Sequence, residues 1–246
     1  MCDPNLFGDR QRPLYIVIIG ISLCLPFASA CFGRTMLRGD GVTEYEKQSI
    51  LDVHNRMRQA VALGQIDGQP PAANMIEMKW DDELAAKAQK WALTCSAARH
   101  DAYRHTDRFL VGQNTASTWT TKTPTEYYEL ESDFPGAIHK WFDEVRKFRF
   151  GKQSHPGAGH YAQMIWANTY LIGCGYSYYY STQRGFTKYY VCNYGPSGNV
   201  DGESPYRKGY PSCYEFGLDN SRKYAGLCEK ADANRDHLFT FHNLIG

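Results

Sequence analysis

Six cysteines follow residue 30, and their spacing decides which chemistry they can do. None belongs to a Cys-x-x-Cys pair, and none lies near histidines at the spacing of a structural zinc site. In a secreted chain an even number of cysteines forms bridges, and six of them allow fifteen pairings. The sequence therefore predicts three disulfides, with the pairing left open, among Cys31, Cys95, Cys174, Cys192, Cys213 and Cys228.

A second group with chemical meaning is Arg38-Gly39-Asp40, which lies in a glycine-containing stretch shortly after Cys31. Integrins recognise this tripeptide on a mobile loop, where the aspartate carboxylate reaches a metal ion on the integrin. Chance alone places the tripeptide in roughly one chain of this length in twenty. Integrin binding through Arg38, Gly39 and Asp40 is therefore kept as a hypothesis.

The composition favours a globular protein and argues against several classes of partner. The chain is 43% hydrophobic and 22% charged, which is enough for a core. Its 27 basic and 26 acidic residues give a net charge of +1, so a nucleic-acid partner gains no electrostatic support. The sequence also lacks a glycine-rich phosphate loop, which disfavours a nucleotide enzyme.

The amino terminus has the features of a secretory signal peptide. An apolar run of 14 residues, from Leu14 to Phe27, follows Arg10 and Arg12 and precedes Ala28-Ser29-Ala30. This order predicts cleavage after Ala30, although a buried helix or a signal anchor are the alternatives. No later segment is long and apolar enough for a transmembrane anchor. We therefore expect a secreted, extracellular protein.

Periodicity predicts several helices in the first two thirds of the chain. A capping box at Thr43-Glu44-Tyr45-Glu46 begins a helix that Gly64 ends, and Asp81 caps a second helix. A third helix is expected over about 136–148 and a short fourth over 160–166. The segments 31–42 and 115–133 are expected to be loops.

The pattern then changes to alternation, which is typical of strands. Apolar positions alternate over 172–178 and 190–194, with turn residues over 181–185 between them, so a β-hairpin is expected. Cys174 and Cys192 would face each other across it, which makes a cross-strand disulfide plausible. Helices followed by a late hairpin indicate an α+β or layered αβα domain.

Three segments together resemble the signatures of the CAP superfamily. They are His54-Asn55-Arg56-Met57-Arg58, the run Gly159-His160-Tyr161-Ala162-Gln163-Met164-Ile165-Trp166, and the run from Tyr190 to Asn199. Their order covers residues 44–200. Pro70-Pro71-Ala72 and Trp80-Asp81-Asp82-Glu83-Leu84 look similar to the antigen 5, or venom allergen, branch.

This resemblance implies a three-layer αβα sandwich with Cys31 paired to Cys95 and Cys174 paired to Cys192. It divides the chain into a signal peptide (1–30), an amino-terminal loop with Arg-Gly-Asp (31–43), a CAP domain (44–200) and an extension (201–246). The extension resembles a reduced cysteine-rich hinge, and Cys213 and Cys228 are expected to staple it.

The resemblance also implies a central cleft. Many CAP domains place two histidines and two acidic residues there, which map onto His100, His160, Glu144 and Gln113. Two imidazoles and one carboxylate could hold zinc or another divalent metal, and Gln113 lowers the expected affinity because its amide is neutral. No cofactor is required by this reading, and a hydrogen-bond network that shapes the cleft is the alternative.

The leading functional hypothesis is a secreted, non-enzymatic effector of saliva or venom that binds a small hydrophobic ligand, a sterol or a fatty acid. Adhesion antagonism through Arg38-Gly39-Asp40 is the second hypothesis. The third is a metal-dependent enzyme that uses His100, Glu144 and His160, although the motifs contain no serine, cysteine or threonine nucleophile.

Overall fold

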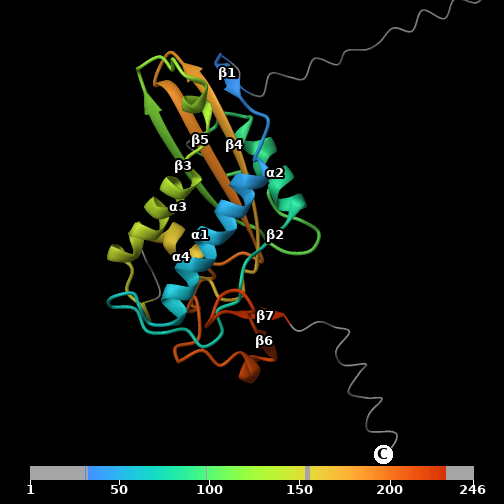
Figure 1. Ribbon diagram of the computed structural model, residues 1–246, viewed down its shortest axis with the longest axis vertical. Coiled ribbons are helices and arrows are strands. Elements are labelled where there is room, and N and C mark those ends of the chain that lie inside the picture. The colour runs from blue at the N-terminus through green and yellow to red at the C-terminus, as the bar shows by residue number, and fades with distance from the viewer. Residues whose placement is uncertain (1–30, 32, 98, 153–155, 231–246) are drawn as a thin grey trace, which may run out of the picture.

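The computed structural model describes residues 31, 33–97, 99–152 and 156–230 (Figure 1). The expected signal peptide and residues 231–246 of the extension lie outside the described residues. The chain forms a central sheet with helices on both faces (Figure 1). This arrangement is the three-layer αβα sandwich that the resemblance implies.

The sheet is built around one long hairpin. Strands β4 (Leu171–Ser181) and β5 (Gly185–Gly195) pair antiparallel, with Cys174 opposite Cys192. Strand β3 (Gly112–Thr120) adds to β5, and β1 (Thr35–Arg38) adds to β4, so the order is β1-β4-β5-β3. A short β2 (Lys79–Trp80) pairs in parallel with the start of β4. The hairpin is therefore the centre of the sheet, as the alternation predicts.

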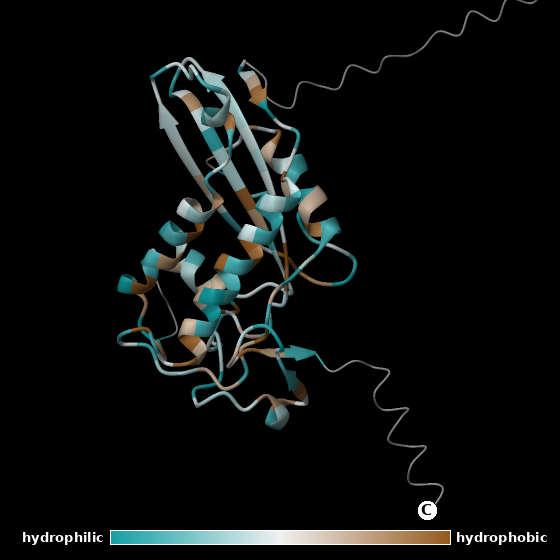
Figure 2. Cartoon of the chain, in the orientation of Figure 1, coloured by the Kyte–Doolittle hydropathy of each residue, from teal (hydrophilic) through white to brown (hydrophobic). Residues whose placement is uncertain are grey.

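One face of the sheet is covered by α1 (Glu44–Ala62), α3 (Phe134–Phe142) and α4 (Gly159–Met164) (Figure 1). Tyrosines of the hairpin fill the space beneath them, and Phe134 packs edge-on against Tyr190 at 5.3 Å. Along α1 and α2 (Asp82–Ala92), hydrophobic positions alternate with hydrophilic ones in Figure 2. Such amphipathic helices must bury one side, which is why they cover a sheet.

The amino-terminal end of α1 forms as its capping box predicts. The Thr43 hydroxyl accepts a hydrogen bond from the Glu46 amide at 3.2 Å, and the Glu46 carboxylate accepts one from the Thr43 amide at 2.7 Å. Two amide donors at the helix start are satisfied in this way. The helix ends at Ala62, two residues before Gly64, which has a positive φ of 70°.

Helix α2 packs directly onto the backbone of β4 on the opposite face. Asp81 caps it by accepting from the Leu84 amide at 2.9 Å. Glycines make the close approach possible, because a Cβ at Gly175 would lie 2.4 Å from the Gln89 Cα. Gln89 in turn donates to and accepts from the backbone of Tyr176. Sequence and packing thus agree on where α2 lies.

Two expected loops are in fact partly strands. Residues 112–120 form β3 and residues 35–38 form β1, whereas 115–133 and 31–42 were expected to be loops. Both are edge strands whose side chains are mostly exposed or half-buried, so they bury too few apolar residues to produce a clear alternation. The rest of the expected loop holds a 3-10 turn, η1 (Tyr127–Leu130).

The third helix is shorter than the expected 136–148. It is α3, and a 3-10 turn, η2 (Asp143–Lys147), continues it. The fourth helix begins one residue before its expected start.

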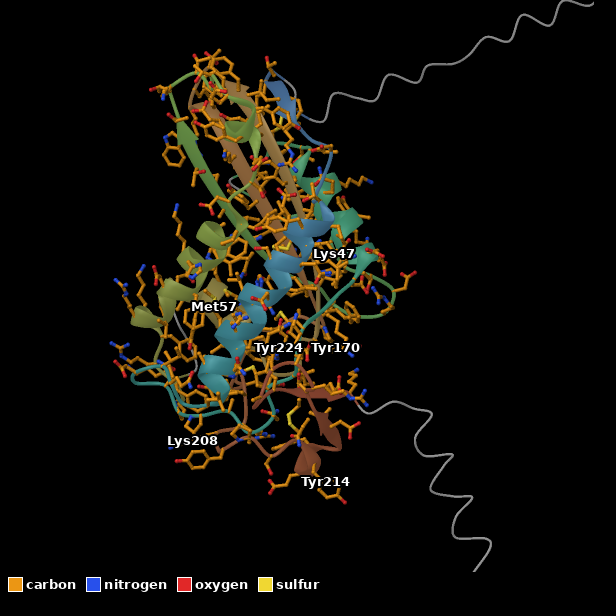
Figure 3. All side chains as sticks on the ribbon, in the orientation of Figure 1. Lys47, Met57, Tyr170, Lys208, Tyr214 and Tyr224 are labelled. Carbon is orange, nitrogen blue, oxygen red and sulfur yellow. A yellow bond between two sulfur atoms is a disulfide. The ribbon has the colours of Figure 1, made fainter. Side chains whose placement is uncertain are left out.

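The extension packs onto the domain instead of standing apart. It contains η3 (Cys213–Phe216) and the two short strands β6 (Leu218–Asn220) and β7 (Cys228–Lys230). The Tyr224 hydroxyl donates to Asp52 of α1 at 3.0 Å, and Figure 3 shows Tyr224 between α1 and the extension. Tyr206 and Leu227 are buried beside it. The extension therefore completes the core below α1.

Three disulfides connect the described cysteines. Cys31 pairs with Cys95, Cys174 with Cys192, and Cys213 with Cys228. These are the pairs that the resemblance and the hinge-like extension imply. Each lies in a different region: the lead to β1, the central hairpin, and the extension.

Candidate functional site

His160 and Glu144, two of the four residues expected to line a cleft, are in direct contact. His160 is the second residue of α4, and its Nδ1 lies 2.7 Å from the Glu144 Oε1. The other carboxylate oxygen, Oε2, accepts from the amides of His160 at 3.0 Å and Tyr161 at 3.3 Å. Burial alone would raise the pKa of Glu144, but the hydrogen bonds and charge of His160 lower it below its ordinary value. Glu144 is therefore an ionised acceptor, and Nδ1 of His160 donates to it.

His100 and Gln113, the other two of these residues, also contact each other. The His100 Nδ1 lies 3.1 Å from the Gln113 Oε1, which also accepts from the Asp101 amide at 3.0 Å. Because an amide N–H can only donate, the Asp101 contact fixes which end of the Gln113 side chain is the oxygen. The Gln113 Nε2 donates to Asn193 at 2.9 Å and agrees with this orientation. Nδ1 of His100 is therefore the donor of its pair.

The same conclusion holds for both imidazoles. Each uses Nδ1 to donate to an oxygen, so a neutral ring has its lone pair on Nε2. The two pairs meet neighbouring residues of β3, since Gln113 contacts His100 and Asn114 donates to the His160 carbonyl at 3.1 Å, although these two side chains point to opposite faces of the sheet. A histidine oriented by an oxygen acceptor is the usual arrangement of a metal ligand.

The donor set for a metal is nevertheless small. Within residues 31–230, apart from the few positions that the structure leaves undescribed, no group of three or more His, Cys, Asp or Glu side chains is placed to hold a metal ion. Both oxygens of Glu144 already accept hydrogen bonds from His160 and Tyr161. Glu144 thus acts as the hydrogen-bond partner that orients His160.

A buried network lies behind this cleft, and sequence reasoning did not find it. The Asn114 side chain donates to the Tyr194 hydroxyl at 3.3 Å, and that hydroxyl lies 3.0 Å from the His54 Nε2. The His54 Nδ1 lies 2.8 Å from the Ile50 carbonyl. Burial lowers the pKa of His54 to about 4, so it is neutral at physiological pH. His54 and Tyr194 do belong to two of the quoted motifs, which is the signal that could have revealed the network.

Arg58 lies in the same motif as His54 and stabilises the fold. Its fully buried guanidinium donates to backbone carbonyls of two separate segments. The acceptors are Ile76, Met164, Trp166, Ala167 and Thr169. Burial lowers its pKa to about 9. This side chain connects α1 to the segment after α4 and takes no part in the cleft.

The Arg38-Gly39-Asp40 tripeptide is only half accessible. The Arg38 side chain is 11% exposed, lies over the Tyr176 ring, and pairs with Glu46 at 3.1 Å. The Asp40 side chain is 73% exposed and accepts from the Arg38 Nε at 2.9 Å. In this conformation the carboxylate faces solvent, whereas the guanidinium is held inside the fold.

Two hollows of the described surface differ in character, the larger one being mainly polar and the smaller one mixed. One of 460 Å³ lies between Asn74, Trp166 and the 202–207 segment. Another, of 210 Å³, lies between the start of α1 and η1, with Tyr45 and Tyr127 at its edge and Leu130 beside them. Both tyrosines are exposed. The second hollow combines an aromatic edge with an apolar side chain.

Comparison with known proteins agrees with the fold and the motifs. Residues 51–194 match the CAP family, the cysteine-rich secretory protein family. This chain belongs to that family. It is 37% identical over 228 residues to the salivary antigen-5 of Dipetalogaster maximus, and the alignment covers 90% of this chain and 91% of that protein. It is 44% identical over 186 residues to the venom allergen 5 of Vespula vidua, which spans 72% and 86%.

A CAP protein of known structure gives the same picture. The crystal structure of NaASP2 with Zn²⁺ superposes with a TM-score of 0.62 at 28% identity, covering 78% of this chain and 98% of that one. The family and the fold expected from the resemblance are thus confirmed. No helix among the described residues is long and apolar enough to cross a membrane.

Proposed function

We propose that this CAP protein is a secreted, extracellular binding protein, not an enzyme, and that its cleft takes a divalent metal ion. The observation that carries the proposal is the orientation of His100 and His160, each with Nδ1 committed to an oxygen. Both Nε2 atoms are then available as ligands, and imidazole suits zinc and copper. The zinc in the NaASP2 structure and the salivary and venom relatives support this reading.

The experiment is a zinc titration by calorimetry, together with native mass spectrometry before and after a chelator. Replacing His100 or His160 with alanine is expected to abolish the heat of binding and the metal mass.

Glu144→Gln should weaken binding roughly 10- to 100-fold, because it removes an orienting partner. Gln113→Glu should strengthen it by adding a carboxylate. His139→Ala is the control, since this exposed histidine hydrogen-bonds the Pro135 carbonyl of its own helix. Equal loss in the control, or no metal on the parent protein, would refute the proposal.

A small hydrophobic ligand, a sterol or a fatty acid, is the second candidate. The hollow edged by Tyr45 and Tyr127 favours it, because these two rings and Leu130 can contact an acyl chain, although the rest of the wall is polar or charged. Its 210 Å³ is less than the roughly 300 Å³ of typical ligand pockets, so a fatty acid fits better than a sterol. Native mass spectrometry of the secreted protein tests this: a co-purified lipid mass that Tyr127→Ala removes supports it, and a bare protein argues against it.

Adhesion antagonism requires more rearrangement. The Arg38 guanidinium would have to leave Glu46 before an integrin could contact both ends of the tripeptide. Asp40→Glu should abolish inhibition of cell adhesion, and equal inhibition by that variant would eliminate the hypothesis.

A metal-dependent enzyme using His100, Glu144 and His160 would need a histidine Nε2 as its general base, because both Glu144 oxygens are occupied. If the protein were such an enzyme, His160→Ala should abolish its turnover, and unchanged turnover would refute this hypothesis.

A further inference from the structure

Basic side chains concentrate on one flank of the molecule. Between residues 140 and 152 the chain has five basic and two acidic residues, although its totals of 27 and 26 are nearly balanced. We call the five basic residues the basic flank: Lys140, Arg146, Lys147, Arg149 and Lys152. They lie at the end of α3, in η2 and in the loop that follows, along the outer side of the molecule (Figure 1).

The charge of this flank is not neutralised by its neighbours. All five side chains are exposed. Of the two acidic residues, Glu144 accepts from His160, and Asp143 lies 3.8 Å from Arg146 with both side chains open to water. Such an exposed pair contributes little. Among the described residues, no other ion pair involves the flank.

The backbone that carries the basic flank is held in place by packing within the protein itself. Phe148 is fully buried, and Phe150 packs on Tyr206 with ring centroids 4.7 Å apart. These two aromatic residues alternate with the cations, so the rings are held in the core while the charges face outwards. Arg149 is further held by its hydrogen bonds to the carbonyls of Arg146 and Phe148. A preorganised surface loses less entropy on binding.

The chemistry of the flank suits a polyanion of sulfate groups. Guanidinium groups bind sulfate-like oxyanions through two parallel hydrogen bonds, and lysines add point charges. A membrane surface fits less well, since basic membrane-binding surfaces also insert aromatic or leucine side chains. None of the described large hydrophobic side chains between residues 134 and 170 is exposed. We propose that the basic flank binds a sulfated polysaccharide.

The test uses heparin as the probe and the whole secreted protein. Affinity is measured by surface plasmon resonance from 0.05 to 0.2 M salt for the parent and two charge-matched variants. The flank variant replaces Arg146, Lys147, Arg149 and Lys152 with glutamine. The control variant replaces four exposed cations elsewhere: Lys90, Lys122, Lys208 and Arg222. Circular dichroism checks that both variants fold, and a zinc titration checks that the cleft is unchanged.

We expect the parent and the control variant to bind heparin and the flank variant to lose binding. If four ionic contacts form, raising the salt from 0.05 to 0.2 M should weaken heparin binding by the parent roughly a hundredfold, because binding releases counterions. No heparin binding by the parent, or equal loss in both variants, would overturn the proposal. Stronger binding to vesicles containing phosphatidylserine, lost in the flank variant, would also overturn it and assign the flank to a membrane. The metal proposal can fail separately, because it rests on the zinc titration alone.

Discussion

The most informative residues of this protein are histidines, and their hydrogen-bond partners distinguish their roles. His100 and His160 each donate to an oxygen from Nδ1 at the protein surface, which leaves Nε2 for a ligand. His54 has partners on both ring nitrogens and no contact with solvent. The same residue type therefore keeps one ring nitrogen without a protein partner in two places, where we propose metal binding, and is part of the buried core in a third.

His54 should make the protein sensitive to acid. The fold favours the neutral ring, because burial lowers the pKa of His54 from 6.5 to about 4. Its contribution to stability is complete above pH 6.5 and is lost as the pH falls towards 4, which amounts to about 3 kcal/mol. Glutamine at this position does not titrate, so His54→Gln does not lose this contribution in acid. The difference in the free energy of unfolding between the parent and His54→Gln should therefore shrink by this amount between pH 7 and pH 4.

Urea denaturation at a series of pH values measures this difference. His139→Gln is the matched control, because His139 is exposed, and its curve should run parallel to the parent curve. A constant gap between His54→Gln and the parent over the whole range would show that His54 titrates normally.

The resemblance selected the residues expected to line the cleft, but their hydrogen bonds could not be predicted from the sequence. His160 and Glu144 lie in segments with helical periodicity, so their neighbourhood could be anticipated. His100 lies in an aperiodic segment, and only the folded chain shows that Gln113 orients it. Arg38 was expected on a mobile loop, since nothing in the sequence indicates that Glu46 and Tyr176 hold it.

At the scale of elements, the packing of α2 on β4 depends on the absence of side chains. Gly175→Ala would place a methyl group 2.4 Å from the Gln89 Cα, so either the helix or the strand must move. Overpacking of this kind costs about 1–3 kcal/mol. Thermal and urea denaturation should show this loss. Gly159→Ala is the control, because the nearest atom to its added methyl would be 4.0 Å away. Equal stability of Gly175→Ala and the parent would mean that α2 does not pack this closely.

Some helices and strands could be predicted from local sequence patterns and others could not. The helix beginning at Glu44 has a capping box and an apolar stripe, and the hairpin has alternating tyrosines, so both were predictable. Strand β3 is rich in threonine, serine and asparagine and takes its place by pairing with β5, from Gly112 opposite Tyr194 to Thr120 opposite Phe186. That pairing is a tertiary interaction, which local periodicity does not encode.

The molecule as a whole is held together by buried phenols, so it should unfold at alkaline pH. Burial raises the pKa of Tyr190 to about 12 and raises the pKa of Tyr161, Tyr176 and Tyr194 further. The fold favours the neutral phenols, while the unfolded chain ionises near pH 10. Their contribution is therefore present below pH 10 and is lost as the pH rises through 12.

Stepwise titration from pH 9 to 12.5 tests this, with phenolate absorbance near 295 nm and far-UV circular dichroism followed together. The last part of the phenolate signal should appear only as the ellipticity is lost. Complete ionisation of the tyrosines with native ellipticity would contradict the expected role of these side chains.

Arg58 has a consequence for how long the folded protein survives outside a cell. Its carbonyl partners come from residue 76 and from residues 164–169, so they surround the guanidinium only when more than a hundred residues of chain have assembled. A segment that opened alone would leave a charge in the interior without acceptors, at high free energy. Opening must then involve the whole domain, and the barrier to it is correspondingly large. If the protein is secreted, as we propose, its lifetime among extracellular proteases would be set by that barrier, and thus by a rate of unfolding more than by an equilibrium.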